Sequence, residues 1–177
     1  PDADGSLCKQ EGYTEKSLCQ ADMTKYIVAY CPYNSNYVMC CGREYSYDAC
    51  VYPLVADGKC GNRFKCRCDS DKYPYKQQSA TICQNTVTGQ NYNNSIASGA
   101  SCVYTGFANG QTSINAYFTE CLCDRGIYPK TEEECSTDGA SVSEKACTDS
   151  NGNKYYTACI CGDDYKVIAS ECEYGIN

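Results

Sequence analysis

The sequence predicts a small, disulfide-rich, mainly β fold: an elongated tandem array of about four short β-hairpin units with little helix. Three observations predict this class. Cysteine supplies 18 of the 177 residues, a density typical of disulfide scaffolds. Leu, Ile, Val, Phe and Met together supply only 25, too few to fill the core of an ordinary domain of this length. Tyrosine, also at 18, provides apolar rings whose hydroxyl groups can stay hydrated in a thin structure.

A repeated cysteine pattern defines the units. Each unit has a first cysteine, a polar stretch, a Cys-x-Cys pair, a tyrosine and a closing cysteine. The four copies are Cys31/Cys40/Cys41/Cys50, Cys60/Cys66/Cys68/Cys83, Cys102/Cys121/Cys123/Cys135 and Cys147/Cys159/Cys161/Cys172, and the tyrosines after the last three pairs are Tyr73, Tyr128 and Tyr165. Because strand side chains alternate, Cys-x-Cys places both sulfur atoms on one face. There they can bond to two different neighbours and tie one hairpin to the next segment.

The amino-terminal segment differs from the rest. Residues 1–30 carry Cys8 and Cys19 outside the repeated pattern, and we expect them to form a cap or an assembly arm. Ser17–Tyr26 is expected to open a helical turn. The most strand-prone apolar run is Tyr26-Ile27-Val28-Ala29-Tyr30, which could pair with an exposed strand edge of another copy or form an ordinary internal strand.

The hairpin units follow in order. Residues 31–83 hold the first two units and residues 102–177 the last two. The segment between them, residues 84–101, is rich in Asn, Ser, Thr and Gly and predicts a long loop or linker. The hairpin turns are expected at Pro32–Asn36, Gly61-Asn62, Asn109-Gly110 and Asn151-Gly152, where Asn-Gly favours the type I′ turn. Thr131, followed by three glutamates, predicts one helical turn with the threonine as its cap.

The first unit departs from the pattern, because Cys40 and Cys41 are adjacent and lack the intervening residue. In a strand, adjacent side chains point to opposite faces. Cys41-Gly-Arg-Glu-Tyr45 nevertheless matches Cys161-Gly-Asp-Asp-Tyr165. We therefore expect Cys41 and Cys50 to follow the repeat more closely than Cys40.

Two segments resemble the second half of an EGF-like module. They are Cys121-Leu-Cys123-Asp-Arg-Gly-Ile-Tyr128…Cys135 and Cys159-Ile-Cys161-Gly-Asp-Asp-Tyr165…Cys172. The resemblance implies local pairing after each tyrosine, as Cys41–Cys50, Cys68–Cys83, Cys123–Cys135 and Cys161–Cys172. It then leaves Cys8–Cys19, Cys31–Cys40, Cys60–Cys66, Cys102–Cys121 and Cys147–Cys159. From the residues alone, three connectivities stay open within each four-cysteine unit.

Cysteine content and net charge limit the expected cellular location and the expected binding partners of the protein. Cytosolic thiols are kept reduced, so this cysteine density predicts a secreted, extracellular or cell-surface protein. The net charge of −7 disfavours nucleic acid and anionic membrane surfaces as partners, because both attract basic patches. No apolar run approaches the roughly 18 residues that a membrane-spanning helix needs. We therefore expect neither nucleic-acid binding nor membrane insertion.

The candidate catalytic groups are few. The chain has no His, which removes Ser-His and Cys-His nucleophilic pairs, and it lacks the Cys-x-x-Cys spacing of structural zinc sites. Asp163, Asp164 and Glu132–Glu134 could serve as acid and base in principle, but nothing in the sequence sets two of them across a cleft. Neighbouring acids in turns are usually solvated. We therefore expect no enzyme activity, no cofactor and no metal.

Two polar motifs need an interpretation. Asp149-x-Asn151-x-Asn153 resembles the start of a calcium loop, but Lys154 and Ile160 stand where such a loop needs Gly and Glu. A hairpin turn is the preferred interpretation. Asn93-Asn94-Ser95 is a glycosylation sequon with Asn93 as the acceptor, and its place in the predicted loop would leave it accessible.

The sequence favours a structural function. We expect an extracellular repeat protein that assembles with other copies of itself into a surface filament or coat, held by about nine disulfides. One alternative is a monomeric adhesin or receptor-like module whose hairpin loops contact a protein or glycan. The tyrosines could form a sugar- or partner-binding surface, although packing beside disulfides is the preferred role for those rings. A second alternative is a secreted protease inhibitor with a reactive loop containing Lys59, Arg63 or Lys65.

Overall fold

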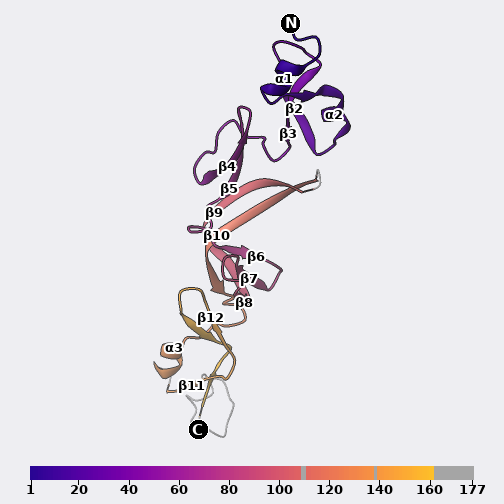
Figure 1. Cartoon of the computed structure of the whole chain (residues 1–177). Coiled ribbons are helices and arrows are strands. Elements are labelled where there is room, and N and C mark those ends of the chain that lie inside the picture. The colour runs from indigo at the N-terminus through magenta and orange to yellow at the C-terminus, as the bar shows by residue number, and fades with distance from the viewer. Residues whose placement is uncertain (109–110, 138, 162–177) are drawn as a thin grey trace. The chain divides into compact units, whose positions relative to one another are not determined.

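The computed structural model describes residues 1–108, 111–137 and 139–161 (Figure 1). The fold is small, mainly β and disulfide-rich with 11% helix, as the sequence predicts. Its strands form several small antiparallel sheets. Two compact units divide the chain: Pro1–Asp69 with Cys102–Asn115, and Ser70–Ser101 with Ala116–Asn177. These units differ from the expected grouping of residues 31–83 and 102–177.

The first unit opens with a three-stranded sheet beside two short helices. The elements are α1 (Ser6–Gln10), β1 (Thr14–Glu15), α2 (Lys16–Ala21), β2 (Lys25–Tyr30) and β3 (Tyr37–Gly42), with the strands in the order β1-β3-β2. The β2–β3 register shifts between Ile27 and Ala29, which marks a β-bulge. Helix α2 covers only the start of the expected Ser17–Tyr26 turn, because the chain already enters β2 at Lys25. Helix α1 was not expected from the sequence.

One hairpin of the first unit forms at its predicted turn, whereas the predicted Asn109-Gly110 turn lies outside the described residues. Strands β4 (Leu54–Cys60) and β5 (Arg63–Cys68) pair across Gly61-Asn62. Gly61 has φ of 59°, a left-handed conformation that glycine adopts without steric cost. The long strands β9 (Ser95–Ala108) and β10 (Gln111–Cys123) are neighbours in a second sheet and contribute residues to both units (Figure 1).

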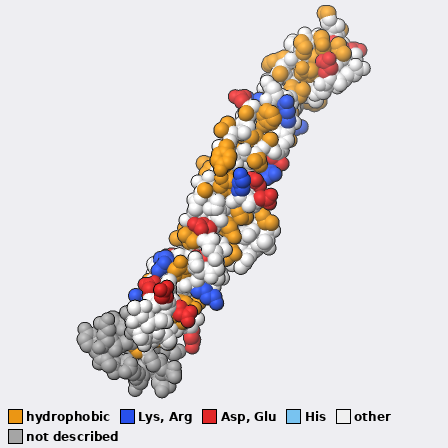
Figure 2. All heavy atoms as spheres, turned by 90° about the vertical axis from the view of Figure 1, so that its left-hand side faces the viewer, with side chains coloured by type: hydrophobic (Ala, Val, Ile, Leu, Met, Phe, Trp, Pro, Cys, Tyr) orange, Lys and Arg blue, Asp and Glu red, His pale blue; other side chains and the backbone are white. Residues whose placement is uncertain are grey.

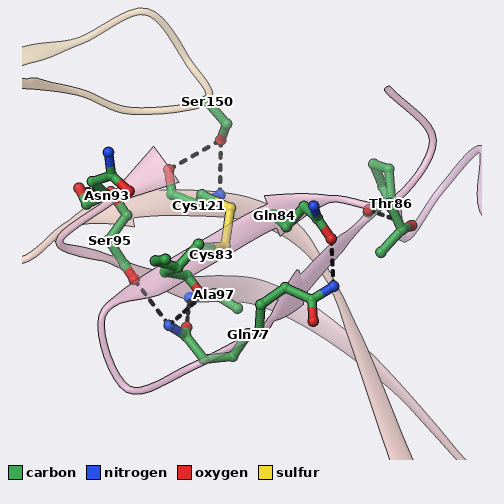
Figure 3. The surroundings of a disulfide bond; sticks show 12 residues. Gln77, Cys83, Gln84, Thr86, Asn93, Ser95, Ala97, Cys121 and Ser150 are labelled. Atoms are coloured by element: carbon green, nitrogen blue, oxygen red, sulfur yellow. Dashed lines mark hydrogen bonds between the residues drawn. A yellow bond between two sulfur atoms is a disulfide. The ribbon is translucent and has the colours of Figure 1, made fainter. Parts of the chain in front are cut away.

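The prediction of a long loop or linker at residues 84–101 is wrong, because this segment contributes strands to the second unit. Most of this segment lies in β7 (Ile82–Asn85), β8 (Asn91–Asn93) and the first half of β9. With β6 (Tyr75–Gln77) these strands form a sheet in the order β8-β7-β6-β10-β9. The Gln77 side chain accepts from Ala97 N at 2.7 Å and donates to Ser95 O at 3.1 Å (Figure 3). The composition did not predict these strands because Asn and Gly are depleted in strands on average, whereas pairing with neighbouring strands decides the outcome here.

The last part of the described chain contains short elements. They are α3 (Glu132–Thr137), β11 (Ser141–Val142), β12 (Ala146–Thr148), β13 (Lys154–Tyr156) and β14 (Cys159–Ile160). The predicted threonine cap of α3 is confirmed. Glu134 N donates to Thr131 Oγ1 at 3.2 Å, and Thr131 N donates to Glu134 Oε1 at 3.2 Å. This reciprocal pair is a capping box.

In the described part of the chain, eight disulfides join cysteines that are far apart in the sequence. The pairs are Cys8–Cys31, Cys19–Cys40, Cys41–Cys60, Cys50–Cys66, Cys68–Cys102, Cys83–Cys121, Cys123–Cys147 and Cys135–Cys159. Among the described residues no cysteine is free. In each successive group of four cysteines, the first bonds to the third and the second to the fourth. The two disulfides of a group therefore interlock.

This connectivity overturns the local pairing implied by the EGF-like resemblance. The pairs Cys41–Cys50, Cys68–Cys83, Cys123–Cys135, Cys8–Cys19, Cys31–Cys40, Cys60–Cys66, Cys102–Cys121 and Cys147–Cys159 do not form. The strand register explains two of these differences. Cys66 faces Ala56 across the β4–β5 hairpin, and Cys147 faces Tyr155 across the β12–β13 hairpin. The expected Cys161–Cys172 pair includes a residue outside the described part of the chain.

The pairing also moves the boundaries of the repeats. The covalently closed repeats are residues 8–40, 41–66, 68–121 and 123–159, called repeats 1 to 4. The pairs Cys66-x-Cys68 and Cys121-x-Cys123 each close one repeat with the first cysteine and open the next with the second. Cys66 and Cys68 bond to Cys50 and Cys102, which confirms that the pair ties neighbouring segments together. Cys40 and Cys41 form the same junction without a spacer, so residues 1–30 belong largely to repeat 1 and are not a separate cap.

Small cores form around the disulfides. Cys8, Cys31 and Tyr37 make one buried cluster against which Tyr13 packs. Cys123, Cys147 and Tyr128 make another, with Tyr155 beside it. Tyr13, Tyr73 and Tyr128 each lie five residues after the first cysteine of a repeat. The preferred interpretation, in which tyrosine rings pack beside disulfides, holds for these clusters.

Candidate functional site: the Asp149 cavity

A cavity of about 640 Å³ lies in the second unit, where β8 and the β12–β13 hairpin meet. Its walls are residues 90–94, Tyr128, residues 145–150 and Gly152, and we call it the Asp149 cavity. Cavities that bind small molecules commonly measure about 300–1,000 Å³. Tertiary structure alone creates this cavity, because its two walls come from different repeats.

Asp149 is the buried acid of the cavity. Its side chain is only 3% exposed. Oδ1 accepts from Asn151 N and from Asn153 N, each at 2.9 Å, which fixes the hairpin turn in the way that aspartate favours. Within residues 1–108, 111–137 and 139–161, Asp149 Oδ2 is the one buried side-chain oxygen or nitrogen without a hydrogen-bond partner. A buried acceptor without a donor costs about 1–3 kcal/mol.

The opposite wall is held in place by Asn94. Its φ is 53°, and no other non-glycine residue in the described chain has a positive φ. Asparagine tolerates this conformation better than most residues. Asn94 Nδ2 donates to Tyr128 Oη at 3.1 Å, and Asp124 N donates to Asn94 O at 2.8 Å. Asn94 therefore connects β8 to the segment that begins repeat 4.

Two tyrosines give the cavity both apolar and polar surface. Tyr128 is 8% exposed and presents the hydroxyl that Asn94 contacts. Burial raises the pKa of Tyr92 above its ordinary value of 10.0, and Tyr75 and Asp149 raise it further. Tyr92 therefore keeps its proton at neutral pH and can donate a hydrogen bond. Its ring meets that of Tyr75 edge to face, with the centroids 6.0 Å apart.

The turn that holds Asp149 is attached to repeat 3. Cys121 N donates to Ser150 Oγ at 2.8 Å, and Ser150 Oγ donates to Cys121 O at 3.1 Å (Figure 3). Ser150 N also donates to Cys121 O at 3.0 Å. Cys121 is itself bonded to Cys83. The Asp149 turn is thus attached to repeat 3 by hydrogen bonds to a disulfide-bonded cysteine.

The motifs singled out from the sequence fall on different parts of the fold. Asn93, the sequon acceptor, is exposed at the end of the outer strand β8 and lines the Asp149 cavity. The Asp149-x-Asn151-x-Asn153 motif forms the preferred hairpin turn, with Gly152 at φ of 83°. Glu132–Glu134 are exposed on α3. Asp163 and Asp164 lie outside the described residues.

The candidate assembly strand and the candidate inhibitor residues lie in the first unit. Strand β2, which contains Tyr26, Ile27, Val28, Ala29 and Tyr30, is an outer strand of its sheet. Arg63 pairs with Asp48, and Lys65 Nζ lies 3.8 Å from Asp57 Oδ2. Lys59 Nζ lies 5.4 Å from the centre of the Phe64 ring. The structure thus gives each of these three basic residues an internal contact.

Sequence reasoning identified Asp149 and Asn93 separately but missed the cavity that contains both. The two residues are separated by 56 positions in the sequence, and nothing in that stretch indicated that the two segments would meet.

Neither a metal-binding group of at least three His, Cys, Asp or Glu nor a helix long and apolar enough to cross a membrane occurs in the described part of the chain. Figure 2 shows acidic, basic and apolar side chains intermixed on the visible face.

Comparisons of this chain with protein-family models, curated proteins and solved structures find no match.

Proposed function

We propose that this chain is a structural subunit of an extracellular filament or coat, in which interlocked disulfide repeats bear tension and copies associate with one another. The disulfides indicate an oxidising, extracellular environment. The observation that carries the proposal is the pairing of first with third and second with fourth cysteine in four successive repeats. Force applied along the chain meets a covalent cross-link in every one of those repeats.

The interlocked pairing makes each repeat tolerant of single bond loss. In repeat 1, force can pass through Cys8–Cys31 and then residues 31–40, or through residues 8–19 and then Cys19–Cys40. Breaking either bond leaves the other route intact. The adjacent junctions Cys40-Cys41, Cys66-Arg67-Cys68 and Cys121-Leu122-Cys123 leave almost no chain that can extend between repeats. Such continuity suits a protein that must keep its length under load.

Self-association is supported by the outer position of β2. The side of β2 that faces away from β3 is an edge of the β1-β3-β2 sheet, and an edge strand offers unpaired backbone groups to another chain. Ala29 and Tyr30 on this strand are exposed. Leu18 and Met23, from the neighbouring α2 region, are 64% and 84% exposed. We propose the β2 edge as the contact between copies.

Oligomeric state tests the assembly part of the proposal. Electron microscopy and light scattering of the oxidised protein over a range of concentrations are expected to show oligomers. Ala29→Lys should shift the protein toward monomer, because lysine on an edge strand blocks strand addition. Ala56→Lys, at another exposed strand alanine, serves as the matched control. A strictly monomeric wild type at high concentration, or equal oligomers in the Ala29→Lys protein, would overturn the β2 contact.

A further inference from the structure

The glycosylation sequon Asn93-Asn94-Ser95 has an exposed acceptor residue. Asn93 ends the outer strand β8 and is exposed. It also lines the Asp149 cavity, so a glycan on Asn93 would begin beside that cavity. N-linked glycans are bulky and hydrophilic, and they are tolerated where the acceptor lies at the surface. A glycan on Asn93 is therefore compatible with the folded chain.

The hydroxyl residue of the same sequon is buried. Ser95 is only 1% exposed. Its Oγ donates to Asn93 O at 3.2 Å and lies 3.5 Å from Cys147 Sγ. Its backbone oxygen accepts from Gln77 Nε2 at 3.1 Å (Figure 3). Transfer of a glycan requires both the asparagine and the hydroxyl group two positions later, because both belong to the recognised motif. The folded chain thus presents one half of this motif and buries the other.

The contact that Cys147 makes with the sequon belongs to repeat 4, which is synthesised after the sequon. Cys147 Sγ lies 3.8 Å from Asn93 O, and Cys147 is bonded to Cys123. Cys147 follows Asn93 by 54 positions, so synthesis at about 5–20 residues per second needs about 3–11 s to reach it. During those seconds Ser95 has no contact with Cys147. The sequon is then available in a form that the folded protein no longer presents.

We propose that Asn93 is an N-glycosylation site that is modified before the Cys123–Cys147 bond closes, and that folding then makes the sequon unreactive. The donor is an oligosaccharide linked to a polyprenyl diphosphate. Asn93 Nδ2 bonds to the anomeric carbon of the first sugar and loses one proton to the transferase. The bond between that carbon and the diphosphate breaks, and the lipid diphosphate leaves with the electron pair. This inference is independent of the self-association proposed above.

The order of glycan transfer and folding has two consequences. A molecule whose repeat 4 closes first keeps Ser95 buried and stays unmodified, so the two forms do not interconvert after folding. A molecule that is modified first can still bury Ser95 against Cys147, because the glycan is carried by the exposed residue Asn93. Both forms are therefore expected to contain the Cys123–Cys147 bond.

The direct test compares folded and unfolded wild type as substrates of a solubilised oligosaccharyltransferase. Protein made without glycosylation in an oxidising bacterial periplasm is supplied with the lipid-linked oligosaccharide, either oxidised or after reduction and alkylation. Peptide mass spectrometry measures the glycan occupancy of Asn93. The unfolded chain should be modified at least about 10-fold faster, because the oxidised protein exposes Ser95 only in rare open states. Equal rates, or no modification of the unfolded chain, would overturn the proposal.

Two double variants test whether the bond beside the sequon is the one that protects it. Cys123→Ser with Cys147→Ser removes that bond, whereas Cys135→Ser with Cys159→Ser removes the other bond of repeat 4. In oxidised protein, the first variant should be modified several-fold faster than the wild type, and the second should react at the wild-type rate. Equal rates in the two variants would overturn the role of the Cys123–Cys147 bond.

Protein secreted by glycosylating cells tests the order of events on the wild-type chain. Asn93 should carry a glycan, and Ser95→Ala should abolish it. Mapping of non-reduced peptides should find the Cys123–Cys147 bond in the glycosylated molecules. Secreted protein without a glycan on Asn93, or glycosylated protein that lacks the Cys123–Cys147 bond, would contradict the proposal.

Discussion

Removing the two disulfides of repeat 3, singly and together, should change the extension of the chain under force in a strongly non-additive way. Repeat 3 contains Cys68–Cys102 and Cys83–Cys121. With both bonds present, the shortest covalent route follows residues 68–83 and crosses directly to Cys121. The segment from Cys83 to Cys121, with a sequence separation of 38, is then protected from extension.

The expected lengths follow from this route. Replacing Cys68 and Cys102 with Ser leaves the route unchanged, so the fully extended length should not increase. Replacing Cys83 and Cys121 moves the route to residues 102–121, which lengthens it by only about 15 Å. Replacing all four cysteines exposes the protected segment and should add about 130 Å, at about 3.6 Å per residue.

Single-molecule force spectroscopy measures these lengths on oxidised protein with handles attached to tags at both termini. Replacing cysteines in bonded pairs avoids unpaired thiols that could form new disulfides. A gain above about 100 Å in either two-cysteine variant would refute the interlocked pairing. A gain in the four-cysteine variant equal to the sum of the other two would refute it as well.

Three further predictions concern stability. Tyr128→Phe should lower the free energy of unfolding by about 1 kcal/mol, because the hydrogen bond with Asn94 is lost. Tyr128→Ala should lower it by about 3 kcal/mol or more, because the buried ring is lost. Equal losses for the two variants in denaturant titrations would contradict the packing role of the ring. The pKa of Glu134 lies below its ordinary value of 4.5 because Thr131 donates to its carboxylate, so the α3 cap is fully formed above pH 4.5 and is lost as the pH falls through the lowered pKa. Carboxyl titration by NMR checks this, and a midpoint at or above 4.5 would be inconsistent with the capping box. Gly5→Ala should destabilise the chain more than Gly12→Ala, because both glycines have positive φ but only a Cβ at position 5 would overlap the Tyr37 ring; equal unfolding midpoints would contradict this.

Local signals determined a large part of the secondary structure. The Gly61-Asn62 and Asn151-Gly152 turns lie between strands where the sequence predicts them, because the turn conformations depend on a few residues. The Thr131 cap of α3 is also local, since its hydrogen bonds span three positions. The sequence missed α1 and assigned the strand-forming segment 84–101 to a loop, because polar composition does not distinguish an outer strand from a loop.

The sequence by itself determined that this protein is a disulfide-stapled series of hairpins with Cys-x-Cys junctions. Only the tertiary structure decided which cysteines bond. A disulfide requires Cα atoms about 4.4–6.8 Å apart, and the eight bonds meet this across sequence separations of 16 to 38. The Asp149 cavity likewise exists because β8 and the β12–β13 hairpin meet. Turns and caps depend on neighbouring residues, whereas bonds and cavities depend on distances that only the folded chain sets.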